Sequence, residues 1–277
     1  MDSNPFKTVW EKRHRIMPYV KRQCRIGERW LAHYLKIVLH KNEKELLALY
    51  NRYLGERCFI IGNGPSLTWT DLDRLIPEYS FASNKIYLSY EFTHFRPSFY
   101  TVIDSYVFDN NRKEIDQIQS KKLFPSYFEQ KMDGRGAVFF RSAGQNLGGF
   151  GAEPVFGKQI YGGYSVVFSQ LQLAWYLGFR KLYLIGMDHT WHLPTGEKPE
   201  QDGYYQVLVG GGEVNHFHPT YRKLGEKWTL PQPKEQEIAY RHARAYIEAH
   251  GGIIQNATRG GKLEVFDRVN FDSLFEV

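Results

Sequence analysis

The residues best suited to chemistry begin with the turn Gly62-Asn63-Gly64-Pro65-Ser66, which follows directly on the apolar, strand-length run Cys58–Ile61. Two glycines let the backbone turn tightly and approach a ligand closely, and Pro65 suits the first position of a helical turn. The free N–H groups of such a turn favour an anion. The stretch therefore predicts a nucleotide phosphate site, with an ordinary tight turn as the alternative. It lacks the third glycine of the dinucleotide fingerprint and the lysine of a Walker A loop, so the nucleotide is not identified.

Four more polar residues stand at the ends of apolar stretches with the length and composition of strands: Asn84, Asp104, Asp188 and Asn256. In open α/β sheets, ligands bind at the carboxyl ends of the strands. We therefore expect these side chains to gather around the turn. A second Gly-rich segment, Gly162-Gly163-Tyr164-Ser165, precedes an apolar helical stretch. It predicts another phosphate contact at a helix N-terminus, with a simple helix cap as the alternative.

Two histidines, His216 and His218, lie in an aromatic-rich stretch, 189–230, that we expect to be irregular. An imidazole titrates near neutrality, which suits a general base. In an extended segment the pair would share one face and could also hold a metal. Candidate third ligands are Asp188, His189 and His192. The sequence has neither the H-E-x-x-H metal motif nor the G-x-S-x-G motif of hydrolases.

The elements that would position these residues alternate between strands and helices, which predicts an α/β fold. The predicted sheet is Rossmann-like and mostly parallel, with helices on both faces. Strands are predicted at 58–61, 80–84, 98–104, 123–124, 137–140, 181–185 and 253–256, and helices at 70–75, 107–120, 166–177 and 234–250. Asp71 and Asp73 form a D-x-D pattern that could hold a divalent metal, but their place beside a helix start favours helix capping.

The first 54 residues differ in charge from the rest of the chain. Apolar residues at helical spacing predict a helical extension over 1–54, ahead of an α/β catalytic domain over 55–277. Residues 1–54 carry 12 Lys/Arg and 5 Asp/Glu, whereas the net charge of the whole chain is +6. This distribution argues against a globally basic nucleic-acid-binding domain. It favours either a helical appendage packed on the domain or a local contact with an anionic membrane surface.

The composition is that of a protein with a hydrophobic core, because hydrophobic residues make up 42% of the 277 residues. Both cysteines, Cys24 and Cys58, are expected to be reduced thiols. No apolar run reaches the ~18 residues of a membrane span, and the first residues do not form a signal peptide. We therefore expect a cytoplasmic protein that could rest on the inner membrane face through residues 1–54.

Several motifs carry a resemblance to known families. The segments IIGNGPSL (60–67), DLDRL (71–75), ASN (82–84) and LGFRKLYLIGMD (177–188) resemble the bacterial sialyltransferases of glycosyltransferase family 42. The segments GYSVV (163–167), NHFHP (215–219) and NATRGGKLEVF (256–266) resemble still more closely the domain-of-unknown-function-115 group, the 6-hydroxymethylpterin diphosphokinase MptE-like proteins. The resemblance spans about residues 55–270. It implies a GT-A-like sialyltransferase variant of the α/β fold.

The sialyltransferase resemblance also implies roles for single residues. His218 or His216 would match the catalytic base, with His218 slightly favoured. Tyr204 and Tyr205 are candidates for the tyrosines that steady the leaving phosphate, and Asn256 would stand near the leaving group or the acceptor. Together with the strand-end residues, the resemblance places at the nucleotide Asn63, Gly64, Ser66, Asn84, Asp104, Gly163, Ser165 and Asp188. Asp104 stands roughly where that family has an Asn, so its role stays open.

The favoured function is an inverting, metal-independent glycosyltransferase. Its donor would be a CMP-activated acidic sugar, sialic acid-like or Kdo-like, and its acceptor a surface glycan, a protein or a lipid-linked sugar. One alternative is an ATP-dependent 6-hydroxymethylpterin diphosphokinase, in which Asp104 and Asp188 would hold Mg²⁺. The other is a nucleotide-binding module without turnover. No nucleic-acid partner is expected.

Overall fold

The chain forms two compact units, Met1–Glu45 and Leu46–Val277. The computed structural model describes residues 41–132, 136–145, 147, 149–153, 158–192, 198–203, 205–210 and 214–276. Residues 1–40, which make up most of the predicted N-terminal extension, lie outside the described residues, so that part of the prediction stays a prediction. Within the described ranges, no helix is both long and apolar enough to cross a membrane.

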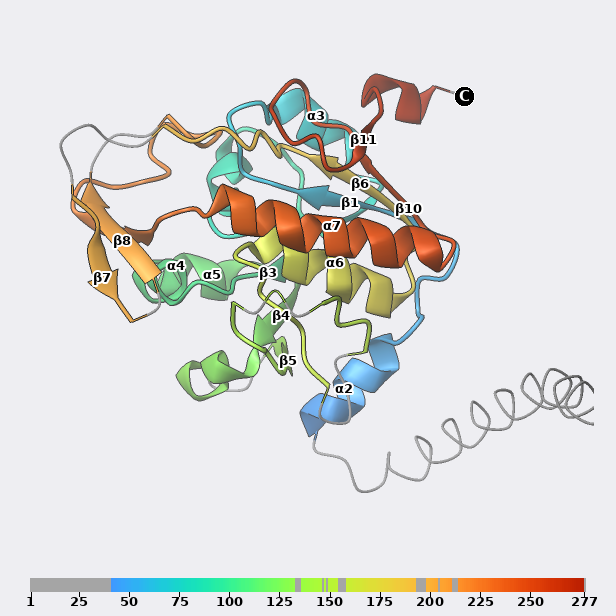
Figure 1. The fold of residues 1–277 in the computed structure, drawn as a ribbon, viewed down its shortest axis with the longest axis horizontal. Helices are drawn as coiled ribbons and strands as arrows, with labels where there is room; N and C mark the ends of the chain where they lie inside the picture. The colour runs from blue at the N-terminus through green and yellow to red at the C-terminus, as the bar shows by residue number, and fades with distance from the viewer. Residues whose placement is uncertain are drawn as a thin grey trace, which may run out of the picture. The chain divides into compact units, whose positions relative to one another are not determined.

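The second unit is built on one eight-stranded sheet in which every pair of neighbouring strands is parallel (Figure 1). Its spatial order is β11-β10-β6-β1-β2-β3-β4-β5. The bounds are β1 Arg57–Ile61, β2 Tyr79–Ser83, β3 Phe99–Thr101, β4 Lys121–Pro125, β5 Ala137–Phe140, β6 Lys181–Ile185, β10 Ile253–Asn256 and β11 Asp267–Arg268. The chain winds outward from β1 to β5 and then returns to place β6 against β1. The sheet therefore has its topological switch point between β1 and β6.

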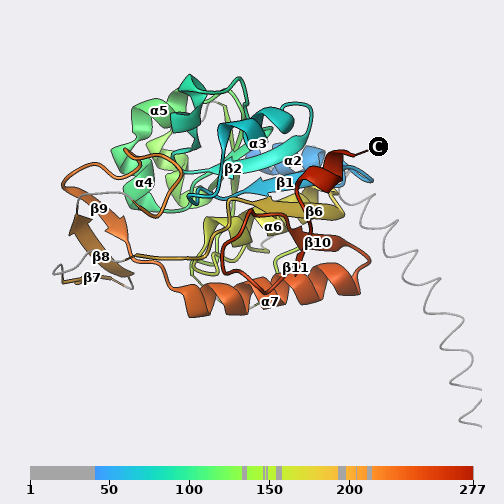
Figure 2. The same ribbon diagram turned by 90° about the horizontal axis from the view of Figure 1, so that it is seen from above.

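Helices cover both faces of this sheet. The α-helices are α2 Lys41–Leu49, α3 Trp69–Arg74, α4 Ser105–Asn110, α5 Arg112–Gln117, α6 Val166–Leu177 and α7 Pro233–Ala249, and the 3₁₀ helices are η1 Ile86–Glu91, η2 Ser126–Lys131 and η3 Asp272–Phe275. Figure 2 shows α6 and α7 on one side of the sheet and α3, α4 and α5 on the other. The predicted α/β fold, with a parallel sheet between two layers of helices, is confirmed.

Each face of the sheet has its own hydrophobic core. Successive side chains of β1 alternate between the two: Cys58 and Ile60 join the core formed with α6 and α7, whereas Phe59 and Ile61 join the core beneath α3, α4 and α5. A strand buried on both faces needs apolar residues at every position, which is why this run has no polar residue. Helix α6 is mostly apolar because it lies between the sheet and α7, and all its residues after the first are buried, including the polar Ser169, Gln170 and Gln172.

Two stretches differ from the sequence-based expectation. The single helix expected over 107–120 is two short helices, α4 and α5, because Asn111 leaves the helical conformation (φ −127°, ψ 28°) between them. The stretch expected to be irregular, 189–230, contains an antiparallel sheet of β7 Glu200–Asp202, β8 Tyr205–Gly210 and β9 Glu226–Thr229. Leu208 of β8 and Trp228 of β9 pair across this sheet and are both buried.

The D-x-D residues have structural partners and do not cap the helix. Thr68 is the N-cap of α3, and its side chain accepts the Asp71 N–H. The Asp71 carboxylate is buried and pairs with Arg259, 2.8 Å away. Asp73 accepts a hydrogen bond from the Thr93 hydroxyl. Helix capping by these aspartates was therefore a wrong prediction, since the threonine just before the helix takes that role.

Candidate functional site

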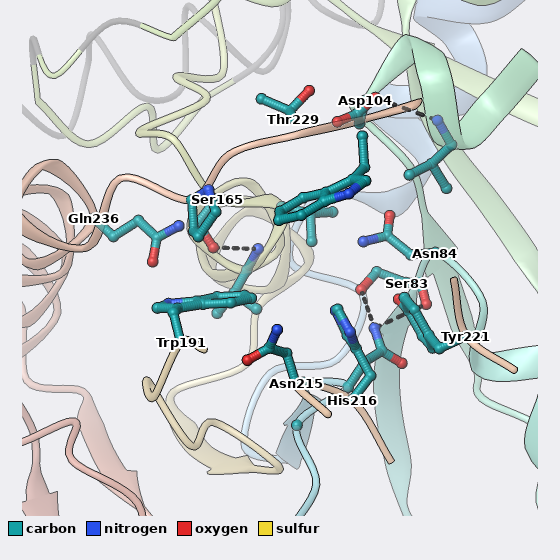
Figure 3. Close-up of a pocket in the computed structure, with 18 of the residues that line it drawn as sticks. Ser83, Asn84, Asp104, Ser165, Trp191, Asn215, His216, Tyr221, Thr229 and Gln236 are labelled. Carbon is teal, nitrogen blue, oxygen red and sulfur yellow. Dashed lines mark hydrogen bonds between the residues drawn. The ribbon is translucent and has the colours of Figure 1, made fainter. Parts of the chain in front are cut away.

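A pocket of about 240 Å³ opens at the carboxyl ends of β1, β2, β3 and β6. Two of these strands, β1 and β6, flank the switch point of the sheet, where open α/β folds bind their ligands. Residues from β9 and the start of α7 complete the wall. Figure 3 shows Asn84, Asp104, Ser165, Trp191, His216 and Tyr221 arranged around this shared space.

Two asparagines and a tryptophan bring unsatisfied polar atoms to the pocket. The Asn63 amide nitrogen donates to the backbone oxygen and to the hydroxyl of Ser83, both at 3.3 Å. Within the described residues, Oδ1 of Asn63, Oδ1 of Asn84 and Nε1 of Trp191 are buried and have no hydrogen-bond partner. Buried polar atoms are nearly always paired in folded proteins. A bound molecule that supplies donors to the two oxygens and an acceptor to the indole would satisfy all three.

Three residues of the pocket wall have left-handed backbone conformations. Asn84 has a φ of 51°, Tyr164 of 57° and His189 of 53°. Asparagine and histidine are enriched among the few non-glycine residues in this region, whereas a bulky residue such as tyrosine rarely adopts it. Such residues persist only where the surrounding structure holds them, and they concentrate at binding and catalytic sites. Their gathering here supports a functional role for the pocket.

In the turn after β1, the hydrogen-bond donors are bound by groups of the protein itself, among them the carboxylate of Asp188. The Gly64 N–H donates to the Gly186 carbonyl at 2.9 Å. The Ser66 N–H and hydroxyl both donate to the Asp188 carboxylate, the hydroxyl at 2.8 Å. These donors are therefore engaged by the end of β6, which differs from the expectation that they are free to hold a phosphate. Asp188 stands where that phosphate was expected.

The glycine of this turn is required by the same close approach. A Cβ on Gly64 would lie 1.9 Å from Asp188 Oδ2 and 2.7 Å from the Gly186 oxygen. Position 64 therefore has room only for glycine, because the chain segments that follow β1 and β6 meet there.

The second Gly-rich segment forms a helix cap. The Ser165 hydroxyl accepts the Val167 N–H at 3.2 Å as the N-cap of α6, and it lies 2.7 Å from the Tyr240 hydroxyl. Gly163 has a φ of 53°, and a Cβ there would lie 2.4 Å from the Phe168 ring. The simple cap, left open as the alternative, accounts for these contacts. Ser165 also lines the pocket.

Asp104 is both a helix cap and part of the pocket wall. Its Oδ1 accepts the Tyr106 N–H at 2.7 Å and the Val107 N–H at 3.2 Å, which makes it the N-cap of α4. Burial raises the pKa of Asp104, while hydrogen bonds from Thr229 and from the Val107 N–H act in the opposite direction. Thr229 belongs to β9, so this carboxyl touches the small antiparallel sheet as well as α4.

The two histidines have different surroundings. His216 lines the pocket, and its ring stacks on Tyr221 with centroids 3.8 Å apart and planes 3° apart. His218 is not among the pocket-lining residues, and its ring lies near Trp69 and Phe92. The segment that carries them is bent, so the expected shared face does not form. Among the described residues, no group of three or more His, Cys, Asp or Glu side chains is placed to hold a metal.

A buried ion pair holds the pocket wall together. Lys85, 3% exposed, places its Nζ 2.5 and 2.7 Å from the Glu226 carboxylate and 2.7 Å from the Tyr221 carbonyl. The contact joins the end of β2 to the start of β9. Sequence reasoning missed both residues, because nothing in the sequence near Lys85 signals a partner 141 positions away.

The structure brings most of the predicted site residues together. Those that line the pocket are Asn63, Gly64, Asn84, Asp104, Ser165, Asp188 and His216, and those that do not are Ser66, Gly163, His218 and Asn256. Asn256 is fully buried, donates to the Leu263 carbonyl and accepts the Thr258 N–H. Tyr204 lies outside the described residues, and of Tyr205 only the backbone is described, in β8. The tyrosine predictions stay predictions.

The strand order and the place of the pocket define a Rossmann-like α/β protein with its candidate site at the switch point. No protein-family model and no curated protein matches the chain. Among solved structures it is similar to the MAf glycosyltransferase from Magnetospirillum magneticum AMB-1, with 14% identity and a TM-score of 0.50 over 84% of this chain. The chain spans only 38% of the length of that protein.

A second solved structure is the sialyltransferase CstII from Campylobacter jejuni in complex with a substrate analogue, cytidine-5'-monophosphate. It has 15% identity and a TM-score of 0.45, over 78% of this chain and 85% of that one. At these identities the likenesses concern the fold.

Proposed function

We propose that the protein is a glycosyltransferase whose pocket binds a nucleotide-sugar donor. The fold likeness to the MAf glycosyltransferase supports this class. The resemblance of the motifs around Asn63, Asn84 and Asp188 to family 42 supports a CMP-activated acidic sugar as the donor. The single observation that carries the proposal is the set of three unsatisfied polar atoms, on Asn63, Asn84 and Trp191, in one pocket at the switch point.

The pocket has the chemistry that a nucleotide needs. Trp191, Trp228 and the stacked pair His216 and Tyr221 offer aromatic surface to a base. Asparagine oxygens accept hydrogen bonds from exocyclic amines or ribose hydroxyls. Arg222 and Lys227 bring positive charge to the same wall. In this proposal these side chains, rather than a metal, balance the charge on the leaving phosphate.

The proposed reaction is a single displacement with inversion. Neutral His216 takes the proton from an acceptor hydroxyl as the acceptor oxygen bonds to the anomeric carbon of the donor. The bond between that carbon and the phosphate oxygen breaks, its electron pair stays on the phosphate, and CMP leaves. His216 is the base in this proposal because it lines the pocket, whereas His218 does not.

The acceptor in this proposal is a glycan, free, on a protein or on a lipid carrier. Residues 1–40 carry nine Lys/Arg and three Asp/Glu. This charge would bring the enzyme to an anionic membrane surface where lipid-linked acceptors are found.

Thermal melting with nucleotides tests the donor site. CMP without metal is expected to stabilise the protein by about 2.7 kcal/mol when its concentration is 100 times its Kd. Asn84→Gly, which suits the left-handed backbone there, should abolish this shift, and Asn110→Ala at an exposed position of α4 should preserve it. Stabilisation by ATP–Mg²⁺ alone would contradict the proposal and favour diphosphokinase chemistry.

A further inference from the structure

A cluster of aromatic rings lies beside the pocket and takes no part in lining it. We define the aromatic shelf as Trp69, Phe92 and His218. The Trp69 and Phe92 rings are stacked, with centroids 4.8 Å apart and planes 14° apart. The His218 ring lies 6.4 Å from Trp69 and 5.8 Å from Phe92. Phe217 supports the shelf with its ring edge-on to Trp69 at 5.5 Å.

The shelf is open to solvent although it is made of large rings. Phe92 is 50% exposed, and Trp69 and His218 are half-buried. The stacked indole covers one face of Phe92, and half of the residue remains exposed to solvent. A stacked, half-exposed pair of rings offers a flat, rigid surface that loses little conformational entropy when something binds to it.

His218 adds a hydrogen-bond donor to this surface. The backbone N–H of Thr220 donates to His218 Nδ1 at 3.2 Å, and the Thr220 hydroxyl lies 2.9 Å from the same atom. A nitrogen that accepts an N–H cannot carry its own proton, so the neutral ring is protonated on Nε2. His218 therefore presents an N–H in its neutral form, which suits binding a hydroxyl oxygen better than removing its proton.

The shelf is continuous with the pocket through the 216–218 segment. The Phe217 N–H donates to the Asn63 carbonyl at 2.9 Å, which fixes this segment against the turn after β1. His216 on one side of Phe217 faces the pocket, and His218 on the other side belongs to the shelf. Two residues of extended chain span at most about 7 Å, so the backbone of His218 lies no further than that from the backbone of the proposed base, His216.

We propose that the aromatic shelf is the subsite for the acceptor, and that it binds a pyranose ring. One face of many pyranoses presents C–H groups, which carry partial positive charge and pack on the negative face of an aromatic ring. Hydroxyls at the edge of the same sugar would accept the Nε2–H of His218. This inference rests on the proposed function, because it places the acceptor beside the pocket assigned to the donor.

Ligand-observed NMR on the full chain tests the shelf directly. The probes are methyl β-D-galactopyranoside, methyl β-D-glucopyranoside and lactose, each added with and without CMP. We expect saturation transfer to the C–H protons of one sugar face for at least one probe. Phe92→Ala and Trp69→Ala should raise the Kd for that probe by about tenfold, the loss of one aromatic contact. Tyr50→Ala, an equally exposed aromatic (49%) that contacts α6, is the matched control and should leave the Kd unchanged.

The outcomes separate the shelf from the donor site. Folding of the Trp69→Ala variant has to be checked. If that variant unfolds, Phe92→Ala still tests the inference, because Phe92 is half-exposed. The inference that the shelf binds the acceptor is overturned if none of the three probes shows saturation transfer, or if Phe92→Ala does not weaken binding of the probe. In either case, stabilisation by CMP would still support the donor site. Weaker CMP binding in Phe92→Ala with unchanged glycoside binding would mean that the shelf holds the nucleotide, which also overturns the inference. Glycoside binding without CMP stabilisation would overturn the proposed function and the acceptor role with it, and the aromatic shelf would remain only a sugar-binding surface.

Discussion

At the scale of single residues, the site depends on how the ends of β1 and β6 meet. Gly62 and Gly64 allow that contact: a Cβ on Gly62 would lie 2.3 Å from the Gly186 oxygen, and one on Gly64 would overlap the Asp188 carboxylate. Asp188 then closes the turn by accepting from Ser66. The turn is a rigid joint between two strands, and it orients Asn63 toward Ser83 and the pocket.

If the protein transfers a sugar as proposed, substitutions of His216 and His218 should have different effects on the pH dependence of the rate. A histidine base works only when neutral, so the rate falls as the pH is lowered. We expect His216→Ala to lower kcat by about 10²–10⁴-fold and to remove this acidic limb. His218→Ala should keep the limb and raise the KM for the acceptor. The measurement is CMP release against pH. If His218→Ala removes the limb and His216→Ala keeps it, the assignment of the base is wrong.

The sequence predicts single site residues where they follow a strand directly. Asn63, Asn84, Asp104 and Asp188 each end an apolar run, and parallel strands bring such ends to one edge. Lys85, Trp191, Trp228 and Gln236 also line the pocket but escape this reasoning. Trp228 and Gln236 reach the pocket only through the packing of β9 and α7 against the sheet. The unsatisfied Trp191 Nε1 becomes visible only once the fold is known.

At the scale of elements, α4 and β9 meet at Asp104. The helix is only six residues long, so its N-cap is a large part of what defines it. Thr229 of β9 acts on the same carboxyl and lowers its pKa. The small antiparallel sheet is held from a second side by the ion pair between Lys85 and Glu226, whose side chains are 4% and 10% exposed. Breaking a buried pair leaves an uncompensated charge, so this contact fixes the pocket wall in place.

Substitutions at Asp104 separate its cap from its charge. Asp104→Ala removes the cap and should lower the free energy of unfolding by about 1 kcal/mol, whereas Asp104→Asn keeps a capping oxygen. The raised pKa means that the fold favours the neutral carboxyl, so its contribution is present below the ordinary value of 3.8 and is lost as pH rises through the raised value. The stability of Asp104→Asn relative to the wild type should therefore increase with pH above about 4. Urea unfolding between pH 3.5 and 7 measures this, and a flat difference would contradict it.

The antiparallel sheet could not be predicted from its sequence. Its strands carry charges such as Glu200, Asp202 and Lys227, and β7 is exposed along its length. Leu208 and Trp228 share one buried face, and the neighbouring Val207 points to the other, so the alternation is too short to identify a strand. The pairing between β8 and β9 joins residues about twenty positions apart, and it is decided by packing rather than by local preference.

At the scale of the whole molecule, the sheet follows from the sequence because its strands are buried on both faces. Runs such as Cys58–Ile61, Ala137–Phe140 and Lys181–Ile185 are almost continuously apolar, as fully covered parallel strands must be. The helical stretches between them place each strand parallel to the last. The order of strands does not follow in the same way, since the return of the chain from β5 to β6 beside β1 depends on the crossing of α6 over the sheet.

The uneven charge of the chain predicts that residues 41–277 bind the nucleotide and that residues 1–40 bind an anionic membrane. The described second unit contains both hydrophobic cores and the pocket, whereas residues 1–40 carry a net charge of +6. We expect a chain of residues 41–277 to keep its CMP stabilisation and a Tm within about 4 °C of the full chain, which corresponds to about 1 kcal/mol. It should lose binding to vesicles that contain phosphatidylserine, because each basic residue near such a surface contributes about 1 kcal/mol.

Vesicle co-sedimentation with the full and shortened chains makes this measurement. Binding of the full chain should disappear on vesicles of phosphatidylcholine alone. It should also weaken steeply in 0.5 M salt, since exposed charges are screened beyond about 4 Å at that ionic strength. Equal binding of the two chains would show that the membrane contact lies in the second unit. A large fall in Tm on shortening would show that residues 1–40 stabilise the sheet, as expected of a helical appendage packed on the domain. These two results would decide between the alternatives that the uneven charge leaves open.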